Sequence, residues 1–450
     1  MKWFGKQHTT PVLLAVISTI IYGYFAFFLD RSEFPKLFGL FALLFIAYYL
    51  ILSHKTHDLK LLLGVGIVSR LVFSIATPNL SQDFYRFIWD GESLLQGINP
   101  YLFTPQQLVQ AKAVTFEFWP VLYHNMGELS ATHFSNYPPI NQFFFVIATW
   151  LGGSSLLGKI IVFRCILLSA DIGILYFGRK LLIHFKKPPH LIFWFFLNPL
   201  VIIEGVGNLH FESVMIFFFV WAIYLLQQHK IKWGAILYAL SISTKLIPLL
   251  FLPAFLRYYN WKKVVLFYGI IGSAVLLLFL PFFSLTFVQN YQETVGLWFS
   301  NFEFNASLYN LIKHLSSHYY EYPTWKLIRE YGAISPILIA TTLCCIALFN
   351  KQKSLQQWMQ TALWILVTYF LFSTTVHPWY LIFVVFLSVF SSYKFGIIWS
   401  FMITLSYYAY SNPTFTESKT LLLLEYLIVI GYIIYEKLNF IKPKLAIPKK

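Results

Sequence analysis

Charged residues are scarce in this 450-residue chain: Asp, Glu, Lys and Arg together make up only 11% of it. An ordinary soluble protein has about 25%. Hydrophobic residues reach 58%, aromatic residues reach 20%, and the mean hydropathy is +0.65. A chain with so few charges cannot cover a water-exposed surface. The composition therefore excludes the soluble and the disordered classes and leaves a membrane protein.

Cysteine is also scarce, and the chain has only Cys165, Cys344 and Cys345. Two of them are adjacent, the third lies in a different apolar run, and no CxxC spacing occurs, so neither a disulfide framework nor a cysteine metal site is indicated. A small-residue cleavage site is missing after the first apolar run, since residues 27–29 are Phe-Phe-Leu. We therefore expect an uncleaved first membrane span and no signal peptide.

Apolar runs of the length that crosses a bilayer, about 20 residues, recur along the chain. Two further stretches, 138–152 and 233–257, are ambiguous because the first is short and the second is broken by polar residues and a proline. The sequence predicts an all-α polytopic membrane protein with about 12–14 transmembrane helices. The clear candidates are 11–29, 37–53, 61–77, 160–178, 189–204, 211–227, 264–283, 331–349, 356–373, 378–392, 395–410 and 420–436.

The net charge of +15 helps to place the two ambiguous stretches, because cytoplasmic loops of membrane proteins carry an excess of Lys and Arg. A segment 138–152 that stays at the outer interface keeps the basic residues of 179–187 inside. Two short helices within 233–257, meeting at the outer tip Ser243-Thr244-Lys245, keep both flanking basic groups inside. Both chain ends are then cytoplasmic, and 21 of the 33 basic residues lie on that side, where they need no nucleic-acid partner.

The longest interruption of hydrophobicity, residues 78–137, lies outside in this topology. It is amphipathic and rich in aromatic residues, so we expect short interfacial helices rather than a disordered linker. The chain is predicted to form one membrane-embedded domain, 1–450. Its parts are three N-terminal spans (1–77), a large extracytoplasmic loop with interfacial helices that carries the candidate site (78–157), central spans (158–283), a second extracytoplasmic loop (284–330) and C-terminal spans (331–450).

Polar motifs end at the same predicted outer face. The chain has only five Asp residues, and Asp83 and Asp90 both fall in the large loop. Seven residues is two helical turns, so one helix face can carry both, with Arg86 between them. An ionisable residue at membrane depth is costly and marks a functional candidate, which applies to Lys245 at the polar tip. The other motifs that reach this face contain Glu204, Asn208, His210, Glu293, Asn301, Glu303, Asn305, His377 and Trp379.

Several of these residues also have a structural interpretation. Asp83 can simply be solvated at the interface, Asp90 can cap a helix, and His377 before Pro378 can start one. Arg164 and Asp171 are seven residues apart on one predicted span. We expect these two to share a face and to compensate one another's buried charge.

One run of this loop is similar to a known family. SQDFYRFIWDG at 81–91, followed by GINPY at 97–101, resembles the first-loop signature of the GT-C glycosyltransferases, and most of all the bacterial polyprenyl-phosphate-dependent mannosyltransferases. Later segments resemble further blocks of the same group in the same order. They are Tyr137-Pro138-Pro139, Asn198-Pro199-Leu200, GNLH at 207–210, TKLIP at 244–248, FNASLY at 304–309 and HPWY at 377–380.

The resemblance implies a GT-C-like fold and transfer of a hexose, commonly mannose, from a polyprenyl-phosphate sugar, with inversion, to an extracytoplasmic lipid-linked or glycan acceptor. It implies that Asp83 is the catalytic general base. Lys245 and Arg86 are suited to hold the phosphate leaving group. The residues expected to bind substrate are Arg86, Asp90, Tyr137, Glu204, Asn208, His210, Lys245, Asn305, His377 and Trp379.

Gln82 stands where related sequences often carry a second acid. This departure argues against an acidic-pair metal site and favours a metal-independent mechanism, so no metal ligand and no cofactor are indicated. A divalent metal ion stays an open alternative. The expected partners are the sugar donor, the acceptor and membrane lipid, without nucleic acid. The resemblance implies a bacterial cytoplasmic membrane with the active site on its outer face.

Two other functions remain open at this point. A transporter or flippase of a lipid-linked sugar would use Lys245, Glu204 and His210 for binding alone. A non-enzymatic subunit of envelope assembly is a third possibility. The sequence has no P-loop and no detectable internal repeat, which argues against an ATP-driven pump and an inverted-repeat transporter.

Overall fold

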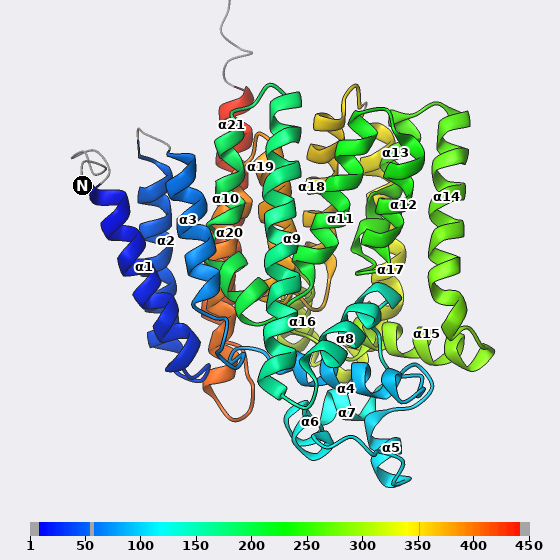
Figure 1. The fold of residues 1–450 in the computed structure, drawn as a ribbon. Coiled ribbons are helices and arrows are strands. Elements are labelled where there is room, and N and C mark those ends of the chain that lie inside the picture. Colours follow the sequence, from blue (N-terminus) through cyan, green and yellow to red (C-terminus); the bar gives the residue numbers. More distant parts are fainter. Residues whose placement is uncertain (1–8, 55–57, 351, 442–450) are drawn as a thin grey trace, which may run out of the picture.

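The computed structural model describes residues 9–54, 58–350 and 352–441. Over these ranges the secondary structure is helical, and a single isolated β-bridge pairs Phe304 with Thr375. The all-α prediction is confirmed. Long helices run side by side through the molecule, and shorter ones gather at its lower end in Figure 1.

The helices of the first half are α1 (Thr9–Phe27), α2 (Phe34–Leu52), α3 (Leu59–Leu71), α4 (Asp83–Leu95), α5 (Pro105–Gln110), α6 (Trp119–Asn125), α7 (Gly127–Thr132), α8 (Pro139–Gly152), α9 (Leu156–His184), α10 (Phe193–Phe196) and α11 (Glu212–Gln227). Those of the second half are α12 (Ile231–Ile242), α13 (Leu252–Tyr258), α14 (Trp261–Phe279), α15 (Leu285–Ser300), α16 (Leu308–Tyr320), α17 (Thr324–Phe349), α18 (Leu355–Phe372), α19 (Leu381–Phe390), α20 (Phe395–Met402) and α21 (Lys419–Ile441). Tighter 3₁₀ turns are η1 (Pro189–Ile192), η3 (Ile247–Phe251), η4 (Leu280–Phe282), η5 (Pro378–Tyr380) and η6 (Ile403–Ser411), and η2 (Val201–Gly207) is a π-helix.

Five helices in the described part of the chain are long and apolar enough to cross a bilayer. Four shorter apolar helices, 10–17 residues long, accompany them. The protein is therefore a polytopic all-α membrane protein, as predicted, while the expected number of about 12–14 crossings stays a prediction. The five long helices are Thr10–Phe27, Phe34–Leu52, Leu156–His184, Trp261–Phe282 and Thr324–Phe349.

Some predicted spans are broken where the sequence predicted continuous helices. The segment predicted at 189–204 is bent by 65° between Pro189–Phe196 and Val201–Gly207, because Pro199 removes a backbone donor and clashes with the preceding turn. The segment predicted at 395–410 is α-helical only to Met402 and continues as 3₁₀ turns. The break in 233–257 matches the prediction, since α12 ends at Ile242 and η3 begins at Ile247.

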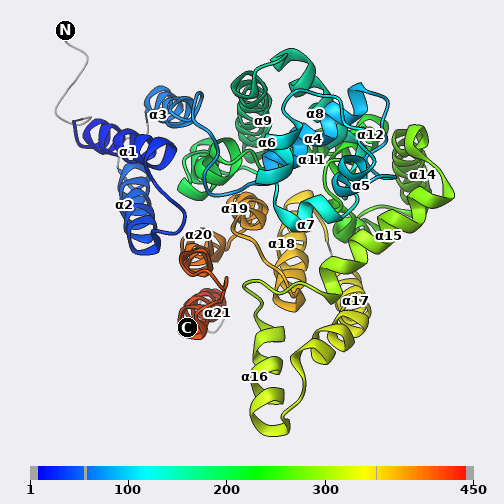
Figure 2. The same ribbon diagram turned by 90° about the horizontal axis from the view of Figure 1, so that it is seen from below.

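The predicted interfacial segments lie together. Helices α4 to α8 gather at the lower end of the bundle in Figure 1, and α15 runs across the same end. Helix α8 has 14 residues and is not among the helices long enough to span. Seen from below in Figure 2, these short helices lie on one side, α1–α3 lie on the other, and the α16–α17 hairpin projects away from the bundle.

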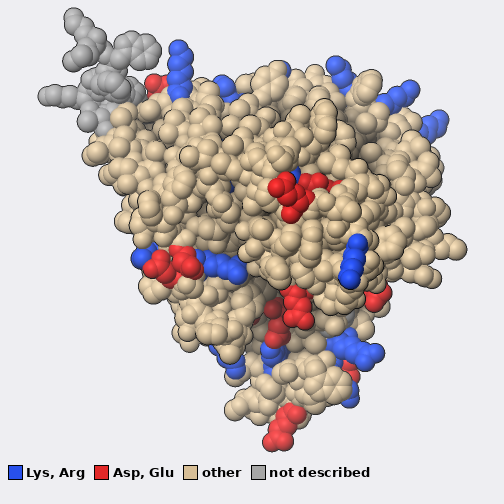
Figure 3. Space-filling view, turned by 60° about the horizontal axis from the view of Figure 1, so that its bottom comes forward, with Lys and Arg blue, Asp and Glu red and all other residues tan. Residues whose placement is uncertain are grey.

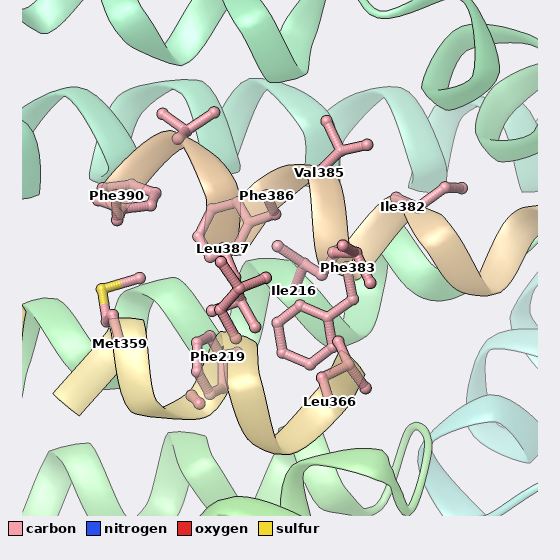
Figure 4. Close-up of a cluster of buried hydrophobic side chains, with 14 of the residues drawn as sticks. Ile216, Phe219, Met359, Leu366, Ile382, Phe383, Val385, Phe386, Leu387 and Phe390 are labelled. Carbon is pink, nitrogen blue, oxygen red and sulfur yellow. The ribbon is translucent and has the colours of Figure 1, made fainter. Parts of the chain in front are cut away.

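The core of the bundle is built around α19. All ten of its residues are buried, so the helix lies inside the bundle and not at its lipid-facing surface. Figure 4 shows Phe383, Phe386 and Leu387 of α19 facing α11 and α18, and the rings of Phe219 and Phe383 meet edge to face at 5.0 Å between centroids. This packing holds the segment before α19, which carries His377 and Trp379, in one place.

The expected compensation of Arg164 by Asp171 is wrong. Asp171 Oδ2 accepts a hydrogen bond of 2.6 Å from Arg70 Nε, and both side chains are fully buried. Arg164 instead donates to the backbone carbonyls of Ser74, Ala76, Val206 and Gly207. A bent chain leaves such carbonyls without helical partners, and a guanidinium has several donors to satisfy them.

The basic residues of the α9 end, the α11–α12 turn and the α13–α14 turn lie at the upper end in Figure 1, opposite α4–α8. On the face shown in Figure 3, charged side chains form small separate groups on an otherwise uncharged surface. Part of the predicted cytoplasmic set falls outside the described residues, as do both chain ends. These residues are Lys2, Lys6, Lys55, Lys351, Lys442, Lys444, Lys449 and Lys450.

Candidate functional site

Asp83 is the first residue of α4, which lies across the lower end of the bundle. Its backbone N–H donates to Ser81 Oγ at 3.3 Å, and the helix N-terminus favours a carboxylate there. Phe87, one turn further, stacks on Phe145 of α8 at 4.6 Å between ring centroids. This contact fixes α4 against α8 and leaves the Asp83 side chain partly exposed at the edge of the buried cluster.

Arg86 and Asp90 pair with one another on α4. Arg86 Nε donates to Asp90 Oδ1 at 2.7 Å, and its Nη1 donates to carbonyls of the 130–133 segment. Asp90 Oδ2 accepts from Ser135 Oγ at 2.6 Å and from Gln142 Nε2 at 3.0 Å. Both residues are buried and tie the large loop to α4 and α8. Their predicted substrate contacts stay predictions, and in Arg86 only Nη2 has no hydrogen bond.

Glu204 lies within the π-helix η2, a backbone form that occurs frequently at functional sites. Its Oε1 accepts from the Tyr407 hydroxyl and from Asn208 Nδ2, and its Oε2 lies 3.3 Å from His210 Nε2. Asn208 also accepts from Leu80 N–H at 3.0 Å. Asn208 therefore anchors the chain that leads into α4, and Tyr407 and Asn208 hold the carboxylate of Glu204 beside His210.

Lys245 lies at the tip between α12 and η3. Its ammonium group donates to Glu212 Oε1 at the start of α11 and lies 5.5 Å from the centre of the Tyr380 ring. The neighbouring Ser243 carbonyl accepts from Ile140 N–H at 3.0 Å, which joins the tip to the start of α8. The lysine thus lies beside the large loop and keeps part of its side chain, 19%, exposed.

Four rings stack in one column that connects distant parts of the sequence. His210 stacks on Trp379 at 3.9 Å, Trp379 on His377 at 4.4 Å, and His377 on Phe304 at 4.9 Å between centroids. The first two pairs are nearly parallel, at 13° and 6°. The column runs from the second loop to the residues around Asp83.

The electrostatics confirm that these groups lie near one another. Burial raises the pKa of Asp83, His210 and Lys245 oppose this shift, and Glu212 and Glu204 add to it. Burial lowers the pKa of His210 to about 4. It also lowers the pKa of His377 to about 3, so both histidines are neutral near pH 7. The structure thus brings together one carboxyl whose proton affinity is raised, a lysine and two neutral imidazoles.

Tyr137 belongs to this group, whereas Asn305 does not. The Tyr137 ring meets Phe87 edge to face at 5.0 Å, and Asp83 contributes to the raised pKa of its hydroxyl, after burial itself. The Asn305 side chain donates to Glu425 Oε1 at 3.1 Å, and its backbone N–H donates to Glu417. The shared outer face was predicted, but Asn305 points into the contact between the second loop and α21.

Sequence reasoning left Glu212 and Tyr407 out of the site. Glu212 stands two residues after His210, in the segment 204–212, which carries two acids, an asparagine and a histidine. This density of polar residues in an apolar chain was the available signal. Tyr407 gave no signal, because it lies in an apolar, aromatic run of the kind found in any membrane span. Within the described ranges, no three His, Cys, Asp or Glu side chains are arranged to hold a metal ion.

Residues 35–259, half of the chain, match the family model described as the alpha-(1→6)-mannopyranosyltransferase N-terminal domain. The chain belongs to this family. A comparison with curated proteins gives no match. The protein is therefore a membrane glycosyltransferase with mannosyltransferase activity, and the resemblance found in the large loop is confirmed.

The match includes α4, the π-helix and the α12 tip, and thus the candidate positions from Asp83 to Lys245. A mannosyltransferase needs a base for the acceptor hydroxyl and positive charge for the leaving group. This mannosyltransferase has a carboxyl, Asp83, whose pKa Lys245 acts to lower, and the lysine lies beside the Tyr380 ring. The arrangement suits displacement at a sugar carbon.

Proposed function

We propose that this mannosyltransferase moves mannose from a polyprenyl-phosphate donor to an extracytoplasmic lipid-linked or glycan acceptor, with inversion and with Asp83 as general base. The observation that carries the proposal is the position of Asp83, Lys245 and His210 at one end of the bundle, where the lysine and the histidine lie near enough to Asp83 to oppose the rise of its pKa. The acceptor O–H attacks the anomeric carbon, its proton passes to Asp83, and the bond to the phosphate oxygen breaks. The phosphate leaves with the electron pair.

With the alpha product that the family description names, the proposed inversion fixes the configuration of the donor. A product in the alpha configuration, formed by one displacement with inversion, requires a donor in the beta configuration. We propose the α-(1→6) linkage for the new bond on the basis of that description. Lys245 supplies positive charge to the leaving phosphate, and a raised pKa suits Asp83 to a proton acceptor that works near neutral pH.

The proposed orientation places α4–α8 on the extracytoplasmic side of a bacterial cytoplasmic membrane. The basic turns that end α9, α11 and α13 lie at the opposite end of the bundle, and the excess of Lys and Arg marks the cytoplasmic side. A cysteine placed at 83 or at 245 is then labelled from outside by a membrane-impermeant reagent. Labelling from the cytoplasm alone would reverse the orientation.

The decisive experiment measures transfer from radiolabelled polyprenyl-phosphate mannose in membranes that contain the wild type, Asp83→Asn or Asp30→Asn. The control position, Asp30, is exposed and bonds only within its own turn, to Ser32. We expect Asp83→Asn to lower transfer at least about 10²-fold, the scale of general-base catalysis, at equal protein level. Transfer by Asp83→Asn at the wild-type rate removes the base assignment, and movement of the lipid-linked sugar without a new glycosidic bond identifies a flippase.

A further inference from the structure

The surface has a hollow that lies apart from the candidate site around Asp83, His210 and Lys245. It opens between the segment 301–303, α16 and the first turns of α17, and has a volume of about 810 Å³. Sites for small ligands commonly have about 300–1,000 Å³. Figure 2 shows α16 and α17 as a hairpin beside α15, at the side of the molecule away from α1–α3.

The side chains around this hollow are aromatic and polar together. Trp325 and Arg329 both line it and lie one turn apart on α17, where residues four apart share a face. Trp325 is 69% exposed, so its indole face is open to a ligand. Tyr309, Asn301 and Glu303 line the hollow opposite. A flat ring with hydrogen-bonding groups around it suits a sugar, which presents C–H faces and hydroxyl groups.

The charges of the lining favour a neutral ligand over a phosphate. The lining holds one positive side chain, Arg329, and one carboxylate, Glu303, so it has no excess of positive charge; Glu303 pairs with Lys313 beside the lining. A carboxylate in the lining repels an anionic phosphate but accepts hydrogen bonds from sugar hydroxyls. The hollow therefore has the character of a carbohydrate site rather than of a lipid headgroup site.

One short segment, 303–304, contributes one residue to the hollow and the next to the ring column that leads to His210. Phe304 forms a bridge with Thr375, since its N–H donates to the Thr374 carbonyl at 2.9 Å and its carbonyl accepts from Val376 N–H at 2.8 Å. Side chains alternate along such an extended segment. Glu303 accordingly lines the hollow, while Phe304 is buried against His377 in the ring column that leads to His210.

We propose that the hollow of Trp325 and Arg329 binds the glycan part of the acceptor, on the route to Asp83. The proposal rests on the proposed function, because it assigns one of the two substrates to a place. It also separates the sites, with the donor phosphate beside Lys245 and the acceptor chain beside α17.

The test measures binding of a soluble manno-oligosaccharide to the detergent-purified full chain by calorimetry. The variants are Trp325→Ala and Arg329→Gln, and the control is Lys326→Ala, an exposed neighbour outside the lining that pairs with Glu330. We expect Kd to rise about tenfold or more in both variants and to stay unchanged in the control. Arg329 is exposed, so its replacement keeps the test valid if Trp325→Ala fails to fold.

The same measurement in the Asp83→Asn background distinguishes the two proposals. Oligosaccharide binding is expected to persist there, because Asp83→Asn removes the base and leaves the residues that line the hollow unchanged. In transfer assays, the α17 variants should raise KM for the acceptor and leave KM for the donor unchanged. Unchanged oligosaccharide binding in both α17 variants overturns the proposal. A loss of polyprenyl-phosphate binding in its place overturns it too and assigns the hollow to the lipid phosphate.

Discussion

His210 stacks face to face on Trp379, with 3.9 Å between the ring centroids and 13° between the planes. His210 follows the π-helix, and Trp379 belongs to the turn before the central helix α19. The contact joins the part of the chain that matches the mannosyltransferase family to a part beyond that match. It makes the position of His210 depend on the packing of the C-terminal helices.

Replacement of Trp379 tests this dependence. We expect Trp379→Ala to lower kcat about tenfold or more and to destabilise the fold by about 3–5 kcal/mol, since it removes a buried ring from the column. Trp379→Phe keeps a flat ring and should retain most of the wild-type kcat and most of the wild-type stability. Thermal unfolding and transfer assays on the purified variants measure the two effects. Equal activity in Trp379→Ala and the wild type would contradict the dependence.

The pH dependence of transfer should report on Asp83. The base must be ionised, and its pKa is raised, so kcat/KM falls on acidification at a higher pH than an ordinary aspartate with a pKa of 3.8 would give. The charge of Glu212 contributes to the raised value. Glu212→Gln should therefore move the acid limb to lower pH. A limb that moves to higher pH in this variant would show that another group titrates.

Lys245 should provide the charge that the leaving phosphate needs. We expect Lys245→Met to lower kcat/KM about 10²-fold or more, a loss typical of one electrostatic group, and Lys245→Arg to recover part of it. Because Lys245 and not a metal ion is proposed at this place, a chelator such as EDTA should leave the wild-type rate unchanged. Loss of transfer in EDTA with recovery on added Mg²⁺ or Mn²⁺ would contradict this assignment.

The buried pair of Arg70 and Asp171 should be structural. Breaking it with Asp171→Asn leaves an uncompensated buried charge and is expected to cost about 3–5 kcal/mol. The double variant Arg70→Met with Asp171→Leu removes both charges. It should lose less stability than Asp171→Asn, because no buried charge is left without a partner. Thermal unfolding in detergent measures the difference. Arg164 offers the contrast, because its partners are carbonyls, so Asp171→Asn leaves its hydrogen bonds intact.

Much of the architecture was predictable from local sequence. The break at Ser243-Thr244-Lys245, the short helices of the large loop and the long apolar helices follow from apolar run length, polar interruptions and charge, which act within about 20 residues. The candidates Asp83, Lys245 and His377 came from the same signals. The predicted topology placed all three on the same face of the membrane. The structure brings these three residues together.

Other features depend on contacts between distant segments, and a single sequence does not contain them. Spacing put Arg164 and Asp171 on one helix face, yet Asp171 pairs with Arg70 because α3 packs there. In the sequence, Tyr407 cannot be distinguished from the tyrosines that commonly lie at membrane–water interfaces. Only the structure shows that η6 places its hydroxyl against Glu204.

The sequence by itself determined that this is a polytopic membrane protein, because composition and apolar run length decide which solvent a chain can enter. The tertiary structure decided the partners of each buried charge. A charge within the bundle is stabilised only by groups that reach it, and the packing of helices selects those groups. The same packing brings Asp83, Lys245 and the ring column to one end of the bundle, where they make up the candidate site.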